Sequence, residues 1–214
     1  MMQVNTLRFR AILGWLGMAL PIIVAILALV FNCLNGRLVP DSISATYYLD
    51  PCITPFMIIL GASGIFLICY NGYDKQDDII CTLAGIFGLF ICIFPCSATA
   101  LANVGMFQLP TDISGMIHNL SAVIFFLLLA YNSYFLFTKG GDNPTPKKLK
   151  RNLIYRICGI GMVASFLLLI PGNIFHIYGM TWFVETIALA FFGISWLTKA
   201  DIYPWLFCDT PYKD

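Results

Sequence analysis

Long apolar runs alternate with short polar segments along the whole chain. The first run, residues 11–31, contains no charged side chain, and the other five are nearly as apolar. Each run is close to the roughly 20 residues that an α-helix needs to cross a bilayer. The pattern therefore predicts six transmembrane helices, at about residues 11–31, 53–70, 79–96, 113–137, 153–171 and 180–198.

The composition agrees with this pattern. Apolar residues make up 59% of the chain and charged residues 11%, whereas soluble domains average about 45–50% and about 25%. Six spans use most of the 214 residues, which leaves no room for a separate soluble domain. We expect one domain over residues 1–214, an all-α polytopic membrane helical bundle. The first run is longer than the 7–15 apolar residues of a signal peptide, so we expect it to be a retained helix.

The positions of Lys and Arg predict how the bundle is oriented. Cytoplasmic segments of membrane proteins are enriched in these residues. Only Arg37, of the 12 basic residues, falls on the predicted outer side. The other eleven fall in the N-terminus, the second and fourth connecting segments, the C-terminus and the adjoining span ends: Arg8, Arg10, Lys75, Lys139, Lys147, Lys148, Lys150, Arg151, Arg156, Lys199 and Lys213. Both termini are therefore predicted to be cytoplasmic, as an even number of spans requires.

Small residues predict where helices approach one another closely. Gly61, Ser63 and Gly64 cluster in the second span, and Ala84 and Gly88 form a small-xxx-small pair in the third. Such residues let helix backbones come close in a membrane. They indicate a compact bundle and carry no information on function.

Polar side chains within the spans are few. His118 and Asn119 come about five residues after the outer start of the fourth span, and Glu185 comes about five residues after that of the sixth. At 1.5 Å per residue, all three lie about 7 Å below the outer boundary. Because a carboxylate in an apolar medium needs a partner, we expect His118 and Glu185 to pair.

The predicted outer loop carries a hydroxyl-rich patch in residues 40–50. Ser42, Ser44, Tyr47 and Tyr48 lie in it, and Thr46 lies between them. We expect this patch to cover the end of the bundle that holds His118, Asn119 and Glu185, so that these residues together line a polar pocket open to the outside. The alternative is structural: tyrosines at this depth often anchor a protein at the membrane interface, and serines often cap backbone groups.

Metal and cofactor sites are not indicated. The chain has two histidines and no HxxxH or HExxH pattern, so we expect no cofactor and no metal. Of the eight cysteines, Cys33, Cys52 and Cys96 fall on the predicted outer side, where a disulfide is chemically allowed. The sequence leaves open whether one forms. It gives no reason to expect a nucleic-acid partner.

The order of these features resembles the Frag/DRAM/Sfk group of small six-span membrane proteins, and most closely its bacterial members. The resemblance rests on Pro40, Ser42 and Ser44 in the first outer loop, on His118 early in the fourth span and on Glu185 early in the sixth. It implies a role connected with membrane lipids and a bacterial cytoplasmic membrane. It implies no common catalytic chemistry.

Three functions follow as hypotheses. The first is a protein that binds or organises lipid through the outer polar pocket, without catalysis. The second is an intramembrane hydrolase or transferase that uses His118 as base, Glu185 as its orienting partner and Ser42 or Ser44 as nucleophile. The third is a small proton-coupled transporter in which Glu185 titrates.

Overall fold

The structure is a computed structural model, and it describes residues 2–140 and 145–202. Lys213, one of the basic residues behind the predicted orientation, lies outside the described residues. The long helices are α1 (Met2–Val30), α2 (Asp50–Ile68), α3 (Lys75–Ile93), α4 (Thr111–Tyr131), α5 (Pro146–Leu167) and α7 (Met180–Lys199). The shorter elements are the 3₁₀ helix η1 (Ser44–Tyr48), the π-helical turn η2 (Asn132–Leu136), helix α6 (Leu169–Ile174) and an antiparallel hairpin of β1 (Asn103–Val104) and β2 (Leu109–Pro110).

Six helices of the described chain are long and apolar enough to cross a membrane. This number confirms the six apolar helices predicted from the sequence and is expected of an integral membrane protein. Their bounds differ from the predicted ones at the polar ends. Helix α5 begins at Pro146, about two turns before the apolar run at residue 153, because Thr145 caps its N-terminus and Pro146 suits its first turn. Helix α1 is continuous through Pro21.

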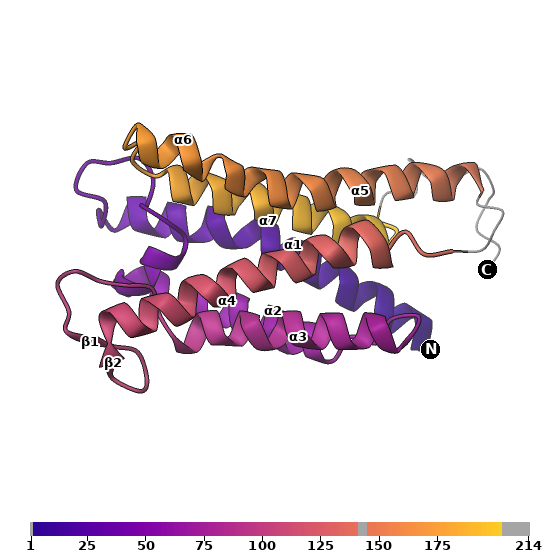
Figure 1. Cartoon of the computed structure of the whole chain (residues 1–214), viewed down its shortest axis with the longest axis horizontal. Coiled ribbons are helices and arrows are strands. Elements are labelled where there is room, and N and C mark those ends of the chain that lie inside the picture. Colours follow the sequence, from indigo (N-terminus) through magenta and orange to yellow (C-terminus); the bar gives the residue numbers. More distant parts are fainter. Residues whose placement is uncertain (1, 141–144, 203–214) are drawn as a thin grey trace.

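The six long helices form a closed ring. Each packs against its neighbours in the order α1, α2, α3, α4, α5, α7, and α7 packs against α1 to complete the ring. Figure 1 shows the helices side by side along the long axis, with the start of α1 and the end of α7 at the same end of the molecule. The first and last spans are therefore neighbours although they are far apart in the sequence.

Glycines allow the closest helix contacts. A Cβ on Gly64 would meet the carbonyl oxygen of Gly85 at 3.0 Å, and one on Gly88 would meet the Phe125 ring at 3.2 Å. Ala84 and Ser63 are also buried. Of the small residues in these two spans, Gly64 lies where α2 meets α3, Gly88 faces Phe125 of α4, and Gly61 has no such neighbour within 4 Å.

The interior of the ring is apolar and aromatic. Among the largest fully buried side chains are Phe56, Leu67 and Trp196, which come from α2 and α7. The π-helical turn η2 directs two consecutive residues, Asn132 and Ser133, into the interior. The hydroxyl of Ser133 lies 2.7 Å from that of Ser195 and so links the end of α4 to α7.

The two ends of the ring differ in chemistry. We call the end where α1 begins and α7 finishes the basic end, because Arg10, Lys139, Lys148 and Lys199 lie there. We call the other end the capped end, because residues 40–49, the capping segment, lie across it and include η1. The hairpin β1–β2 and helix α6 also lie at the capped end (Figure 1).

Candidate functional site

Glu185 binds the capping segment. Its Oε2 accepts the backbone N–H of Ile43 at 2.5 Å, and its Oε1 accepts the hydroxyl of Ser44 at 3.2 Å. A second backbone bond, from Trp182 N–H to the carbonyl of Asp41 at 3.1 Å, ties the same segment to the start of α7. Glu185 therefore holds the capping segment onto the ring.

His118 has a different partner. Helix α3 ends at Ile93, just before Pro95, because proline has no N–H to continue the helix. The carbonyls after this end need donors. His118 Nδ1 lies 2.8 Å from the carbonyl oxygen of Phe94, and Ser114 donates to that of Pro95 at 2.8 Å. Because a carbonyl only accepts, the proton is on Nδ1 of His118.

The third carbonyl of this stretch, that of Cys96, accepts the hydroxyl of Tyr48. Burial raises the pKa of Tyr48 to about 12, so the phenol stays protonated and able to donate at neutral pH. Tyr48 thus joins η1 to the end of α3. Tyr47 packs edge-on against Tyr48 and Phe56.

The residues predicted to line one polar pocket are divided among several local contacts. No hydrogen bond or ion pair joins His118 to Glu185, Ser42 or Ser44 within residues 2–140 and 145–202. The hydroxyl of Ser42 accepts the N–H of Ala45 at 2.8 Å, a backbone cap. The described residues therefore do not form the hydrogen-bonded chain from Glu185 through His118 to Ser42 or Ser44 that an intramembrane hydrolase would need.

The cavity beside Glu185 is small. It has a volume of about 40 Å³, and apart from Ser44 and Glu185 its lining is apolar, with Leu20, Phe56 and Phe125 among the residues. By the same measure, about 10–15 Å³ is enough to hold one water molecule. In this conformation the cavity beside Glu185 has space for a few water molecules and none for a lipid headgroup.

The two neighbouring polar residues of α4 differ in exposure. Asn119 is exposed, whereas His118 is buried.

The three cysteines predicted to lie on the outer side form no disulfide among the described residues. Cys33, Cys52 and Cys96 are all free thiols. Burial raises the pKa of Cys96 to about 12, which keeps its thiol protonated and unreactive at neutral pH. At the predicted outer loops, His176 is exposed, and Tyr178 packs its ring 3.8 Å from the guanidinium carbon of Arg37.

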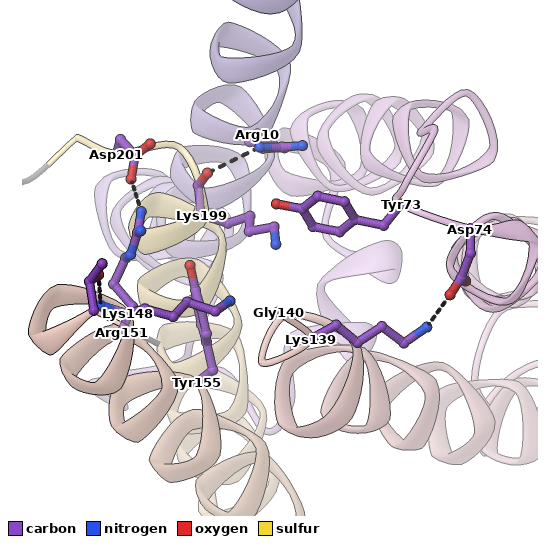
Figure 2. Close-up of a pocket in the computed structure, with 11 residues that line it drawn as sticks. Arg10, Tyr73, Asp74, Lys139, Gly140, Lys148, Arg151, Tyr155, Lys199 and Asp201 are labelled. Atoms are coloured by element: carbon purple, nitrogen blue, oxygen red, sulfur yellow. Dashed lines mark hydrogen bonds and ion pairs between the residues drawn. The ribbon is translucent and has the colours of Figure 1, made fainter. Parts of the chain in front are cut away.

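A much larger cavity opens at the basic end. Its volume is about 540 Å³, within the range of about 300–1,000 Å³ typical of small-molecule sites. Figure 2 shows that the side chains around it come from α1, the α2–α3 turn, the segment after η2, α5 and α7. The lining residues are Arg10, Tyr73, Asp74, Lys139, Gly140, Thr145, Lys148, Arg151, Tyr155, Lys199 and Asp201.

The start of α5 supplies one wall of this cavity. Thr145 accepts the backbone N–H of Lys148 at 3.3 Å and so fixes the first turn. Lys148, Arg151 and Tyr155 are spaced by three and four residues, which puts them on one face of the helix. That face is turned to the cavity, whereas Lys150 is exposed and does not line it.

The turn between α2 and α3 supplies a second wall. Asp74 caps α3 by accepting the N–H groups of Gln76 and Asp77 at 3.0 and 3.1 Å. Asp77 is buried and accepts the N–H of Tyr73 at 3.0 Å. Lys139 then bridges Asp74 at 2.8 Å and Asp77 at 2.7 Å. The hydrogen bond from Lys139 holds the pKa of the Asp74 carboxyl below its usual range.

Lys199 is the most unusual residue of the cavity. Only 7% of it is exposed, yet its ammonium group has no carboxylate partner within the described residues. The ammonium nitrogen lies 4.7 Å from the ring centre of Tyr73, 4.9 Å from that of Phe137 and 5.9 Å from that of Tyr155. These cation–π contacts hold the charge in place, and the ammonium makes no hydrogen bond to another described residue.

Arg10 and Lys148 also lack a carboxylate partner among the described residues. Arg10 donates to the backbone carbonyl of Lys199 at 3.4 Å, and its buried Nε has no hydrogen-bond partner. Lys148 donates to the carbonyl of Phe137 at 3.1 Å. Arg151, in contrast, forms an ion pair with Asp201 at 2.8 Å. The basic-end cavity thus combines two ion-paired cations, Lys139 and Arg151, with three that lack a carboxylate partner among the described residues.

An aromatic layer separates the cavity from the apolar interior. Trp196 packs edge-on against Tyr70 and Phe137, with ring centres 5.1 Å apart in both pairs, and Phe137 packs against Tyr155 at 5.4 Å. Burial raises the pKa of Tyr70 to about 12, so this ring adds no negative charge. These packed rings lie between the basic-end cavity and the apolar interior of the ring.

An apolar groove runs along the outside of α4 and α5. Two adjoining hollows of about 250 and 630 Å³ share Leu127 and Val163. The larger one reaches Tyr134 and Phe135 in η2, only a few residues before Lys139. Nearly all of the lining is hydrocarbon or aromatic, as suits contact with lipid chains.

Sequence reasoning did not find the basic-end cavity, because the charges were used only to predict orientation. Two signals were present. Lys199 continues the buried stripe of α7 three residues after Trp196, and a lysine on a buried stripe of a span is exceptional. Lys148, Arg151 and Tyr155 share a helix face.

Comparisons of the chain with protein-family models, curated proteins and solved structures gave no match. The function is therefore inferred from the geometry of these two ends.

Proposed function

We propose that the protein binds the phosphate-bearing headgroup of an anionic membrane lipid in its basic-end cavity. The observation that carries the proposal is the buried ammonium of Lys199, which faces a cavity of about 540 Å³ without a carboxylate partner among the described residues. A cation withdrawn from water is costly unless an anion compensates it. A phosphate group supplies both the charge and the acceptor oxygens that Lys199, Arg10 and Lys148 require.

Position favours a lipid over a soluble anion. We propose that the basic end faces the cytoplasm, as the distribution of Lys and Arg predicts, in what the family resemblance suggests is a bacterial cytoplasmic membrane. Anionic headgroups lie at this level, and basic pockets between transmembrane helices at this face bind them. The apolar groove between α4 and α5 offers a surface for the acyl chains next to the same end. The resemblance to the Frag/DRAM/Sfk group also points to lipids.

The capped end gives less support to a binding function. Both oxygens of the Glu185 carboxyl are already used by the capping segment, and the adjoining cavity has about 40 Å³. We therefore assign Glu185 a role in holding the capping segment. A transporter would need a polar path between the two ends, and the aromatic layer around Trp196 argues against one in this conformation.

Lipid analysis of purified protein tests the proposal. The wild type and three variants are purified in the same mild detergent, and the lipids that remain bound are quantified by mass spectrometry. Lys199→Met removes the buried charge but keeps an unbranched chain among the aromatic rings. Glu185→Gln alters the capped end, and Lys150→Gln removes an exposed charge of α5 outside the cavity as a matched control.

An anionic lipid enriched in the wild type should be lost from Lys199→Met and retained by Lys150→Gln and Glu185→Gln. Loss in Glu185→Gln with retention in Lys199→Met would contradict the proposal and would place the lipid at the capped end. Equal amounts of the same bulk lipids in all four proteins would remove lipid binding as the function. Thermal melting of each variant shows whether a loss of lipid merely reflects unfolding.

A further inference from the structure

The balance of charge in the basic-end cavity restricts what kind of phosphate it takes. The lining residues include five cations and two carboxylates, Asp74 and Asp201. Asp77 contacts Lys139 from the buried side and belongs to the same cluster. With Lys199 protonated, the five cations and three carboxylates of the described residues give this cluster a net charge of +2.

A phosphodiester and a phosphomonoester differ in charge. A diester headgroup carries one negative charge, whereas a monoester carries about 1.5 to 2 at neutral pH. One negative charge would leave part of the cavity charge uncompensated in a site that is closed beneath by aromatic rings. Two negative charges would balance it.

The donors around the cavity lead to the same conclusion. Arg10, Lys148 and Lys199 have N–H groups to donate, and the hydroxyls of Tyr73 and Tyr155 make no hydrogen bond within the described residues. Figure 2 shows the charged ends of Lys148 and Lys199 turned towards the interior of the cavity. A monoester presents three terminal oxygens to such a group of donors and a diester only two.

We propose that the basic-end cavity selects a phosphomonoester headgroup over a phosphodiester one. This inference rests on the proposed function and adds the chemical class of the ligand. The shared chemistry is a terminal phosphate, whether it belongs to a lipid or to a water-soluble molecule. The second negative charge is bound by Lys148 and Lys199. Neither lysine has a carboxylate partner among the described residues.

A binding comparison tests the inference. Purified full-length protein in detergent is titrated calorimetrically with phosphatidic acid, a monoester, and with phosphatidylglycerol, a diester with the same acyl chains. The water-soluble monoester sn-glycerol 3-phosphate forms a third arm. The same titrations are run on Lys148→Gln, on Lys199→Met and on Lys150→Gln as the matched control two residues from Lys148.

We expect phosphatidic acid to bind about tenfold more tightly than phosphatidylglycerol, as one additional charge-assisted contact would give. The advantage should vanish in Lys148→Gln and Lys199→Met and persist in Lys150→Gln. Melting temperatures within the wild-type range establish that each variant is folded. If Lys199→Met does not fold, Lys148→Gln provides the test, because Lys148 lies in the first turn of α5.

Each other outcome has a definite meaning. Equal affinity for the two lipids would overturn the phosphomonoester inference and leave lipid binding intact. Absence of binding to either lipid would overturn the proposed function itself. A preference for phosphatidic acid that both lysine variants retain would place the selectivity outside this cavity and refute the inference. Binding of sn-glycerol 3-phosphate as tight as that of phosphatidic acid would support the headgroup chemistry but contradict a lipid ligand.

Discussion

The contact between Glu185 and the capping segment gives a quantitative prediction. In Glu185→Gln, compared with the wild type at a pH where the Glu185 carboxyl is ionised, the charged acceptor of the Ile43 N–H becomes a neutral amide oxygen of nearly the same shape. A hydrogen bond to a charged group contributes about 1.5–3 kcal/mol, and one between neutral groups about 1 kcal/mol. The bond from Ile43 measures 2.5 Å and that from Ser44 3.2 Å, so the first should carry most of the difference, about 1–2 kcal/mol.

Hydrogen–deuterium exchange measures this loss directly. If residues 43–48 exchange by local opening, a loss of about 1–2 kcal/mol accelerates their exchange about 5- to 30-fold. The β1–β2 hairpin lies at the same end, but the hydrogen bonds of Glu185 to described residues go to Ile43 and Ser44 and none goes to the hairpin, so its exchange should not change. Ser44→Ala removes only the longer bond and should give a smaller acceleration. Unchanged exchange of residues 43–48 in Glu185→Gln would refute the idea that this carboxylate holds the segment.

Two further predictions concern the α2–α3 hairpin. A Cβ on Gly85 would collide with the carbonyl oxygen of Gly64, so Gly85→Ala should destabilise the protein by about 1–3 kcal/mol in detergent melts, whereas Gly61→Ala, with open space around it, should melt like the wild type. Because Lys139 holds the pKa of Asp74 below that of an unfolded chain, about 3.9, the pair should stabilise the fold fully above that pH and lose its effect as the pH falls further. Melting curves of Asp74→Asn should lack this part of the acid destabilisation, and an identical acid profile in both proteins would contradict it.

The spans were predictable because apolar length alone decides them. Apolar runs of about 20 residues have no other stable environment, and the first and last runs gave bounds within a few residues of the membrane-crossing parts of α1 and α7. The short elements were not predictable in the same way. The π-helical turn η2 lies inside an apolar run that any helix would fit, and the bond between Ser133 and Ser195 depends on a neighbouring helix that the local sequence does not reveal.

The partners of the buried polar residues were predicted from depth, and depth was insufficient. His118 and Glu185 lie near the same end of the bundle, but His118 bonds to the carbonyl of Phe94 and Glu185 to the N–H of Ile43. Backbone donors and acceptors are the same in every residue, so a sequence does not show which of them lack a partner. Pro95 was the available sign, since the helix before it had to end and leave carbonyls free.

The basic-end cavity could be predicted only by knowing which helices are neighbours in the ring. Its cations come from segments separated by more than a hundred residues, and each alone fits the usual excess of basic residues near cytoplasmic span ends. Arg10 and Lys199 become neighbours only because α1 packs against α7. A long-range contact of this kind leaves no local signal in the sequence.

The place of α7 in the ring has a consequence for biosynthesis. This helix is made after the other spans and fills the gap between α1 and α5, the two helices that it contacts most. Until it is inserted, the chain lacks Lys199 at one end and Glu185 at the other, so neither the cavity nor the fastening of the capping segment exists. In a ribosome-bound intermediate with five spans, the face of α1 that packs against α7 in the complete fold would still be exposed to lipid. If the cavity binds a lipid headgroup as proposed, binding requires α7 to be in the membrane first.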